Sequence, residues 1–125
     1  MESYKPLNWS DFPDGFTPFF LNPTGAHLET RELGTGVYAL LSSIPNVDNA
    51  GFVVGEREVL VIDAHINIAM ARQILERVRE VTDKPIRYLV NSNYHGDHTF
   101  GNCAFPSDTL IVQHRRSAAL VEFFE

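Results

Sequence analysis

Three side chains that can bind a metal ion lie within four consecutive residues of this chain. They are His95, Asp97 and His98, in the segment NYHGDHTFGN over residues 93–102. Neutral imidazole and carboxylate form a ligand set that suits zinc and related transition metals. Two glycines in the segment allow the sharp bends that would bring such ligands together. By itself His-x-Asp-His is a weak signal, because surface loops with hydrogen-bonded histidines share it.

The other histidines and the cysteine have weaker claims to a chemical role. His65 follows Asp63 closely and could approach the site, although a polar residue where a helix begins is the commoner explanation. His27 and His114 have no partner at ligand spacing. Cys103 is the single cysteine, so the chain can form neither an internal disulfide nor a thiolate zinc site. Any metal site must therefore use His, Asp and Glu.

Short apolar segments must position these residues. Runs rich in strand formers predict strands over residues 37–41, 52–54, 59–63, 86–90 and 109–113. The four residues that separate the second run from the third suit a hairpin connection. Apolar residues at spacings of three and four predict a helix from Ile68 to Val81 that ends before Pro85. Residues 91–102 are predicted as a loop, and residues 115–125 as a second helix.

Composition excludes several classes of function. A chain of 125 residues with 44% hydrophobic content fits one domain. Its net charge of −6 lacks the basic excess that nonspecific nucleic-acid binding requires. Its apolar runs are far shorter than the roughly 20 residues that span a bilayer, and residues 1–10 do not resemble a secretory signal. We therefore expect a cytoplasmic protein that binds neither nucleic acid nor membrane.

The N-terminal residues differ in composition from the rest of the chain. Residues 1–30 contain four of the seven prolines and six large aromatic side chains. Proline blocks long helices, and aromatic side chains are unfavourable in water, so we expect an extended arm packed on the core rather than a partner-binding tail. The expected division is a Pro- and aromatic-rich arm over residues 1–32 and a domain over residues 33–125.

Two motifs in this domain resemble those of the metallo-β-lactamase superfamily. Its signature is His-x-His-x-Asp-His on a loop after a strand, often followed by Thr-x-Gly-Asn, which residues 93–102 resemble. The segment VIDA over residues 61–64 is similar to the family's first motif, an Asp at the end of a strand. The resemblance covers residues 33–125 and implies an α/β (α+β) fold, the αββα sandwich, of which only the N-terminal half would be present.

What the resemblance implies for function is metal-assisted hydrolysis of a small-molecule ester, lactone, thioester, amide or phosphoester. The implied cofactor is one or two Zn²⁺ ions, with other divalent transition metals as alternatives. His95 would bind the first metal, and Asp97 and His98 the second, with Asp97 also the catalytic residue. Asp63 would support the site loop through hydrogen bonds instead of coordinating. A bound metal lowers the pKa of water to about 7.

The sequence departs from the family pattern at Asn93, which stands where the first histidine is usual. An amide oxygen is a poorer zinc ligand than imidazole. A similar Asn occurs in the mono-zinc carbapenemase subclass, where the second site carries the catalysis. The family's remaining ligands come from its second half, and a catalytic zinc needs about three protein ligands. We therefore expect the chain to need its C-terminal half or self-association.

A second hypothesis is a catalytically inactive binding or dimerising module with a degenerate metal site. Half of a two-sheet sandwich would expose an apolar sheet face, which favours association. Substitution of His95 and His98 would leave that association unchanged, whereas it would remove metal binding from an enzyme.

Overall fold

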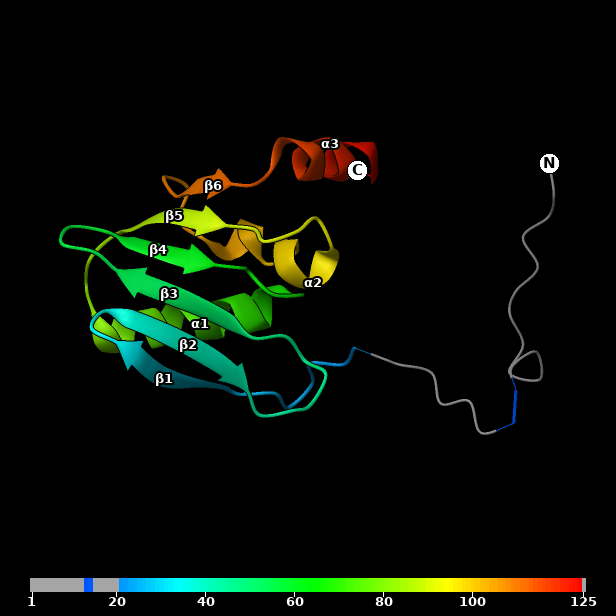
Figure 1. Cartoon of the computed structure of the whole chain (residues 1–125), viewed down its shortest axis with the longest axis horizontal. Coiled ribbons are helices and arrows are strands. Elements are labelled where there is room, and N and C mark those ends of the chain that lie inside the picture. The colour runs from blue at the N-terminus through cyan, green and yellow to red at the C-terminus, as the bar shows by residue number, and fades with distance from the viewer. Residues whose placement is uncertain (1–12, 15–20, 125) are drawn as a thin grey trace.

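The computed structural model describes residues 13–14 and 21–124 of the chain, and the expected arm therefore lies largely outside the described residues (Figure 1). The described part is built on one six-stranded sheet whose strands follow one another in chain order. They are β1 (Leu28–Gly34), β2 (Val37–Ser42), β3 (Ala50–Val54), β4 (Val59–Ile62), β5 (Ile86–Val90) and β6 (Leu110–Val112).

The direction of pairing changes within the sheet. Strands β1 to β4 pair antiparallel, while β4, β5 and β6 pair parallel. Parallel neighbours require a crossover, and α1 (Ile68–Val81) supplies it between β4 and β5. The carboxyl ends of β4 and β5 therefore lie at the same edge, which is where ligand sites form in parallel sheets.

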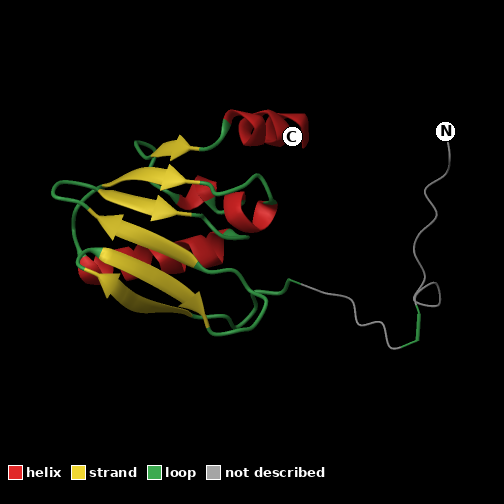
Figure 2. Ribbon diagram, in the orientation of Figure 1, coloured by secondary structure: helices red, strands yellow, loops and turns green. Residues whose placement is uncertain are grey.

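Helix α1 begins and ends where its sequence dictates. The Asn67 side chain accepts a hydrogen bond from the Met70 amide at 2.9 Å, which caps the first turn. The helix buries Met70, Ala71, Ile74 and Val78 on one side. These side chains join a single core with sheet residues that include Phe52, Val61 and Leu89. In Figure 2 the helix lies behind the sheet, so it covers one of the two sheet faces.

The opposite face of the sheet is apolar and exposed. The strand register places Val53, Ile62, Tyr88, Leu110 and Val112 on this face, away from Phe52 and Val61. Their exposed fractions lie between 36% and 47%. None of the helices in the described ranges lies in front of the strands in Figure 2. We call these five side chains the open face.

The structure confirms the mixed α/β class and each of the predicted strands and helices, with small shifts in their ends. Strand β1 was not predicted, and it begins at Leu28, within the residues assigned to the arm. Its residues after Leu28 are exposed, so it lacks the apolar alternation of a half-buried strand. Two short helices were not predicted, α2 (Gly96–Thr99), inside the predicted loop, and the 3-10 helix η2 (Asn102–Ala104) at its end, whereas α3 (Arg115–Phe124) is the predicted second helix. None of the helices in the described residues is long and apolar enough to cross a membrane.

Candidate metal centre

The backbone after β4 adopts an unusual conformation at the edge of the sheet. Asp63 and His65 have φ values of 65° and 68°, in the left-handed region that non-glycine residues rarely adopt. This segment is held by hydrogen bonds to residues 91–102, which we call the α2 loop. The Ala64 amide donates to the His98 carbonyl at 2.9 Å, and the Gly101 amide donates to the His65 carbonyl at 3.0 Å. Such strain persists where surrounding structure enforces it, often at functional sites.

The Asp63 carboxylate organises the loop that carries the predicted ligands. It accepts hydrogen bonds from the Ser92 amide and from the Ser92 hydroxyl, both at 2.7 Å. Its Oδ2 atom also lies 2.9 Å from Nδ1 of His98. A carboxylate that accepts from one ring nitrogen of a histidine fixes the tautomer and aims the other nitrogen at a metal. In this chain that other nitrogen is Nε2, which lies 3.6 Å from Oδ2 of Asp97.

Hydrogen bonds between two asparagine side chains join the two ends of the same loop. Asn91 is 3% exposed and exchanges amide hydrogen bonds with Asn102, at 3.0 Å and 2.9 Å. The Asn91 side chain also donates to the His98 carbonyl at 3.1 Å. The loop is therefore fixed at both ends, and its side chains project from a rigid base.

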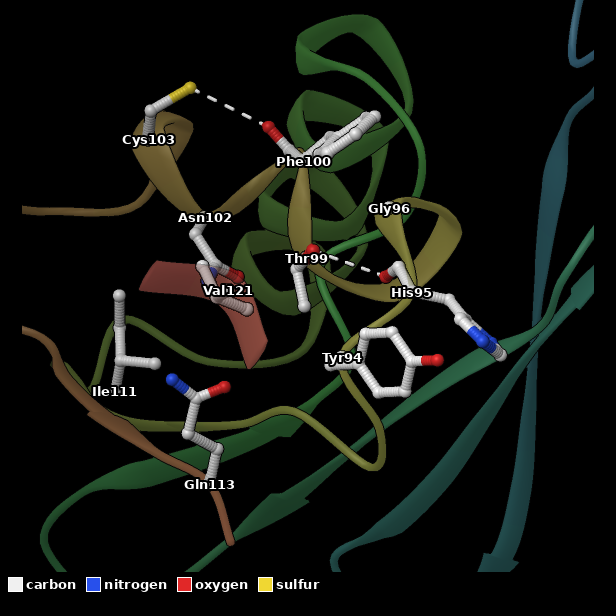
Figure 3. Close-up of a pocket in the computed structure, with 10 residues that line it drawn as sticks. All are labelled: Tyr94, His95, Gly96, Thr99, Phe100, Asn102, Cys103, Ile111, Gln113 and Val121. Atoms are coloured by element: carbon white, nitrogen blue, oxygen red, sulfur yellow. Dashed lines mark hydrogen bonds between the residues drawn. The ribbon is translucent and has the colours of Figure 1, made fainter. Parts of the chain in front are cut away.

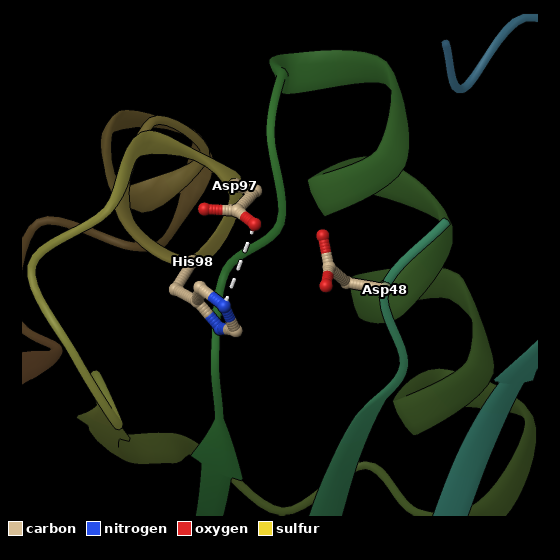
Figure 4. A group of neighbouring side chains, drawn as sticks. All are labelled: Asp48, Asp97 and His98. Carbon is tan, nitrogen blue, oxygen red and sulfur yellow. Dashed lines mark ion pairs between the residues drawn. The ribbon is translucent and has the colours of Figure 1, made fainter. Parts of the chain in front are cut away.

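Asp97 and His98 meet a third residue that the sequence analysis did not single out. Asp48, in the loop between β2 and β3, offers a carboxylate oxygen, and one donor atom from each of the three residues lies within 4.8 Å of the others (Figure 4). Its Oδ2 atom is buried and has no hydrogen-bond partner among the described residues. Burial, followed by the neighbouring Asp97 carboxylate, raises the pKa of Asp48.

A neutral histidine holds the Asp48 backbone. The Ile66 amide donates to Nδ1 of His65 at 3.0 Å, so the ring hydrogen is on Nε2, which donates to the Asp48 carbonyl at 3.0 Å. His65 is 1% exposed, and its burial lowers its pKa. Its position in the sequence favours a polar residue at the start of a helix. In the structure its side chain instead ties the β2–β3 loop to the end of β4.

The predicted hairpin places the backbone of Asp48 near the right end of the sheet, but it does not place the side chain. Strand β3 runs antiparallel to β4, with Gly51 opposite Ile62. The residues just before β3 therefore lie at the edge where β4 ends. The sequence alone does not show how the β2–β3 loop turns, and so whether this carboxylate points toward Asp97.

His95 and Asn93 do not join the group that Asp48, Asp97 and His98 form. His95 is exposed, and its ring lies against Tyr94, with the ring centroids 4.5 Å apart. The Asn93 side-chain oxygen accepts a hydrogen bond from the His95 amide at 2.8 Å. The amide side chain at position 93 therefore shapes the turn that leads into α2.

A largely apolar cavity of about 740 Å³ lies next to His95 (Figure 3). Its lining includes the apolar side chains of Phe100, Ile111 and Val121, the Tyr94 ring and Cys103. The cavity is formed between the α2 loop, β6 and α3, so it opens beside the loop that carries Asp97 and His98.

Comparison with known proteins identifies the family. The sequence model of the metallo-beta-lactamase superfamily matches residues 44–125, which include Asp48, Asp63 and the α2 loop. The chain belongs to the metallo-beta-lactamase superfamily. Its members include metal-dependent hydrolases, and one of the similar solved structures is a mono-zinc form.

The similar proteins support the fold. A metallo-beta-lactamase from Hirschia baltica superposes with a TM-score of 0.65 at 20% identity, covering 78% of this chain and 48% of that one. The metallo-beta-lactamase FIM-1 from Pseudomonas aeruginosa, in its mono-zinc form, gives 0.65 at 19% identity, covering 78% and 46%. A linear primary-alkylsulfatase from Pseudomonas sp. (strain ATCC 19151) is 32% identical over 53 residues, 42% of this chain and 10% of its own length. The chain thus spans about half of these superfamily structures.

Proposed function

We propose that this chain carries the metal-binding part of a hydrolase that cleaves an ester, lactone, thioester, amide or phosphoester. The observation that supports the proposal is the contact between Asp63 and Nδ1 of His98, which aims Nε2 toward Asp97. Imidazole nitrogen and carboxylate oxygen are ligands that divalent transition metals accept. Beside them lies the buried Oδ2 atom of Asp48, which has no hydrogen-bond partner in the part of the chain that the structure describes. The donor set therefore fits a divalent metal, for which we propose zinc.

Each residue of the site has its own role in the proposed reaction. His98 and Asp97 would hold the metal, and the contact of Asp63 with Nδ1 keeps the His98 ring in one orientation. The second oxygen of the Asp97 carboxylate can accept a hydrogen bond from the attacking water, which is the catalytic role we propose for it. His95, exposed on the same loop, is the proposed ligand of the other ion, which is the first metal of the family pattern. When bound, the metal lowers the pKa of water to about 7 and polarises the attacked oxygen.

The apolar cavity next to His95 favours a substrate with an apolar group. Most of its lining surface is apolar, so an acyl or alkyl chain would gain free energy by leaving water there. An alkyl sulfate belongs in the substrate panel as well, because one relative of this chain is an alkylsulfatase.

A hydrolysis panel with metal analysis tests this function. The complete gene product is prepared, and its zinc content and its rates on each proposed substrate class and on an alkyl sulfate are measured. We expect bound zinc, hydrolysis of at least one class, and loss of both in His98→Ala. Absence of zinc together with absence of hydrolysis in every class would contradict the proposal.

The open face supports the second hypothesis, a binding or dimerising module. Five exposed apolar side chains on one sheet face favour association with a second copy or with a C-terminal half of the fold. Under this hypothesis the double substitution of His95 and His98 by Ala leaves association unchanged. The cytoplasmic location, the arm over residues 1–32 and the absence of nucleic-acid binding stay predictions.

A further inference from the structure

The Asp48 carboxylate is held in a position that costs free energy without a cation. It lies opposite the Asp97 carboxylate, and like charges at such a distance repel each other. Its Oδ2 atom is buried and lacks a hydrogen-bond donor within the described ranges. Native proteins seldom leave a buried polar atom unpaired without a functional reason.

The loop that carries Asp48 is fixed in this position. Val47, the preceding residue, is 6% exposed and belongs to the core. Nε2 of His65 donates to the Asp48 carbonyl at 3.0 Å. On the other side, the Asn49 side chain accepts a hydrogen bond from the Ser42 amide at 2.8 Å. The carboxylate therefore cannot leave Asp97 by a simple movement of the loop.

We propose that Asp48 is a third protein ligand of the metal bound by Asp97 and His98. The inference rests on the proposed function, which requires a metal at this site. Zinc lies about 2 Å from nitrogen and oxygen ligands, so donors on one ion are within about 4 Å of each other. The donors here lie within 4.8 Å of one another, a spacing that side-chain rotation can reduce. Two carboxylates and one neutral imidazole match the charge of a dication.

The consequence is that this chain supplies three ligands by itself. Three protein ligands with one open position are the arrangement of a catalytic zinc. The motif residues alone provide two ligands at this position. With Asp48, the metal does not require a ligand from a C-terminal half or a second copy.

Zinc titration of the 125-residue chain tests the proposal. The probe is zinc alone at neutral pH, followed by calorimetry, with Asp48→Asn as the variant and Asp83→Asn as the control. Both variants remove one carboxylate charge, but Asp83 is exposed in the loop between α1 and β5. We expect one zinc per wild-type chain and affinity at least about tenfold weaker in Asp48→Asn, since loss of even an outer-shell partner has effects on this scale. Asp83→Asn should bind as the wild type does.

A second measurement separates ligation from a structural role. No donor among the described residues faces Oδ2 of Asp48, and Asp48→Asn removes the repulsion with Asp97, so the zinc-free variant should unfold at the same or a higher denaturant concentration than the wild type. Zinc should stabilise the wild type by more than it stabilises the variant. Cobalt bound in place of zinc should show a changed visible absorption spectrum in Asp48→Asn.

The outcomes distinguish this inference from the proposed function. Equal zinc affinity in the wild type and Asp48→Asn overturns the role of Asp48 and leaves a metal site on Asp97 and His98. A wild-type chain that binds no zinc also overturns the inference, and the hydrolysis panel with the complete gene product then decides the proposed function. A zinc-free Asp48→Asn that unfolds more easily than the wild type shows a structural role and contradicts the proposal.

Discussion

Asp63 is the residue whose side chain fixes the site loop to the sheet. It accepts from the Ser92 amide, the Ser92 hydroxyl and Nδ1 of His98. Asp63→Asn replaces one acceptor oxygen by a donor NH₂ group, which faces other donors. We expect the zinc-free protein to lose about 2–3 kcal/mol of unfolding free energy, the scale of a broken charge-assisted hydrogen bond. Urea unfolding followed by circular dichroism measures the loss.

Asp83→Asn is the matched control for this substitution, because Asp83 is exposed beyond the end of α1. Its unfolding free energy should stay within about 0.5 kcal/mol of the wild type. Equal stability of the Asp63→Asn protein and this control would show that the Asp63 contacts do not hold the loop.

His65 connects two chain segments through both ring nitrogens. His65→Leu keeps an apolar side chain in the buried position but leaves the Ile66 amide and the Asp48 carbonyl without their side-chain partners. The expected loss of unfolding free energy is about 2–4 kcal/mol, since each buried unpaired group costs about 1–3 kcal/mol. Thermal and urea unfolding measure it. In His27→Leu, at an exposed position, stability should not change; a similar loss there would rule out the specific role of His65.

At the scale of the elements, the contact between the α2 loop and helix α1 depends on Gly101. Neither Gly96 nor Gly101 has a positive φ, so left-handed backbone is not what requires glycine at either position. Glycine is required at position 101 because there is no room for a side chain. A Cβ atom there would lie 1.9 Å from the Ala64 carbonyl oxygen and 2.8 Å from the Ala71 Cβ. The backbone of the loop therefore packs directly on β4's end and on α1.

Gly101→Ala should destabilise the protein strongly, because the added Cβ atom would force the loop away from the Ala64 backbone, which has no room to move. We expect a loss of about 3 kcal/mol or more, at the upper end of overpacking effects. Gly34→Ala is the control, since a Cβ at Gly34 meets nothing within 4 Å. Urea midpoints of the two variants give the comparison. If both glycines tolerate alanine equally, the close packing of the loop on α1 is not maintained in solution.

At the scale of the whole molecule, the open face determines how the chain behaves at high concentration. Val53, Ile62, Tyr88, Leu110 and Val112 form an apolar surface that water contacts. We expect concentration-dependent association of the 125-residue chain in sedimentation velocity. Ile62→Glu together with Val112→Glu should reduce it, because association would bury two charges.

Ala69→Glu is the control for association, since it adds a charge at an exposed position on helix α1, on the covered side of the sheet. This variant should associate as the wild type does. A wild-type chain that stays monomeric at every concentration would contradict the role of the open face.

The sequence by itself determined the local elements and the identity of two chemical groups. Helix α1 follows from apolar spacing and the Asn67 cap, and strand β5 from a compact apolar run. Asp97 and His98 were found because adjacent ligand-type residues on a glycine-containing loop leave a local pattern. Strand β1 was missed because, apart from Leu28, its side chains are exposed, and its pairing with β2 comes from backbone hydrogen bonds that side-chain pattern does not encode.

Tertiary structure alone decided which distant groups meet. The ends of β3, β4 and β5 meet at one edge of the sheet, and this brings Asp48, Asp63 and His65 to the site. Asp63 and His98, which are 35 positions apart in the sequence, then share a hydrogen bond. Residue type gives the chemistry a side chain can do, but the distance between two side chains depends on strand pairing and loop conformation. These are set by the free energy of the whole fold, so the proposed third ligand at Asp48 becomes visible only in three dimensions.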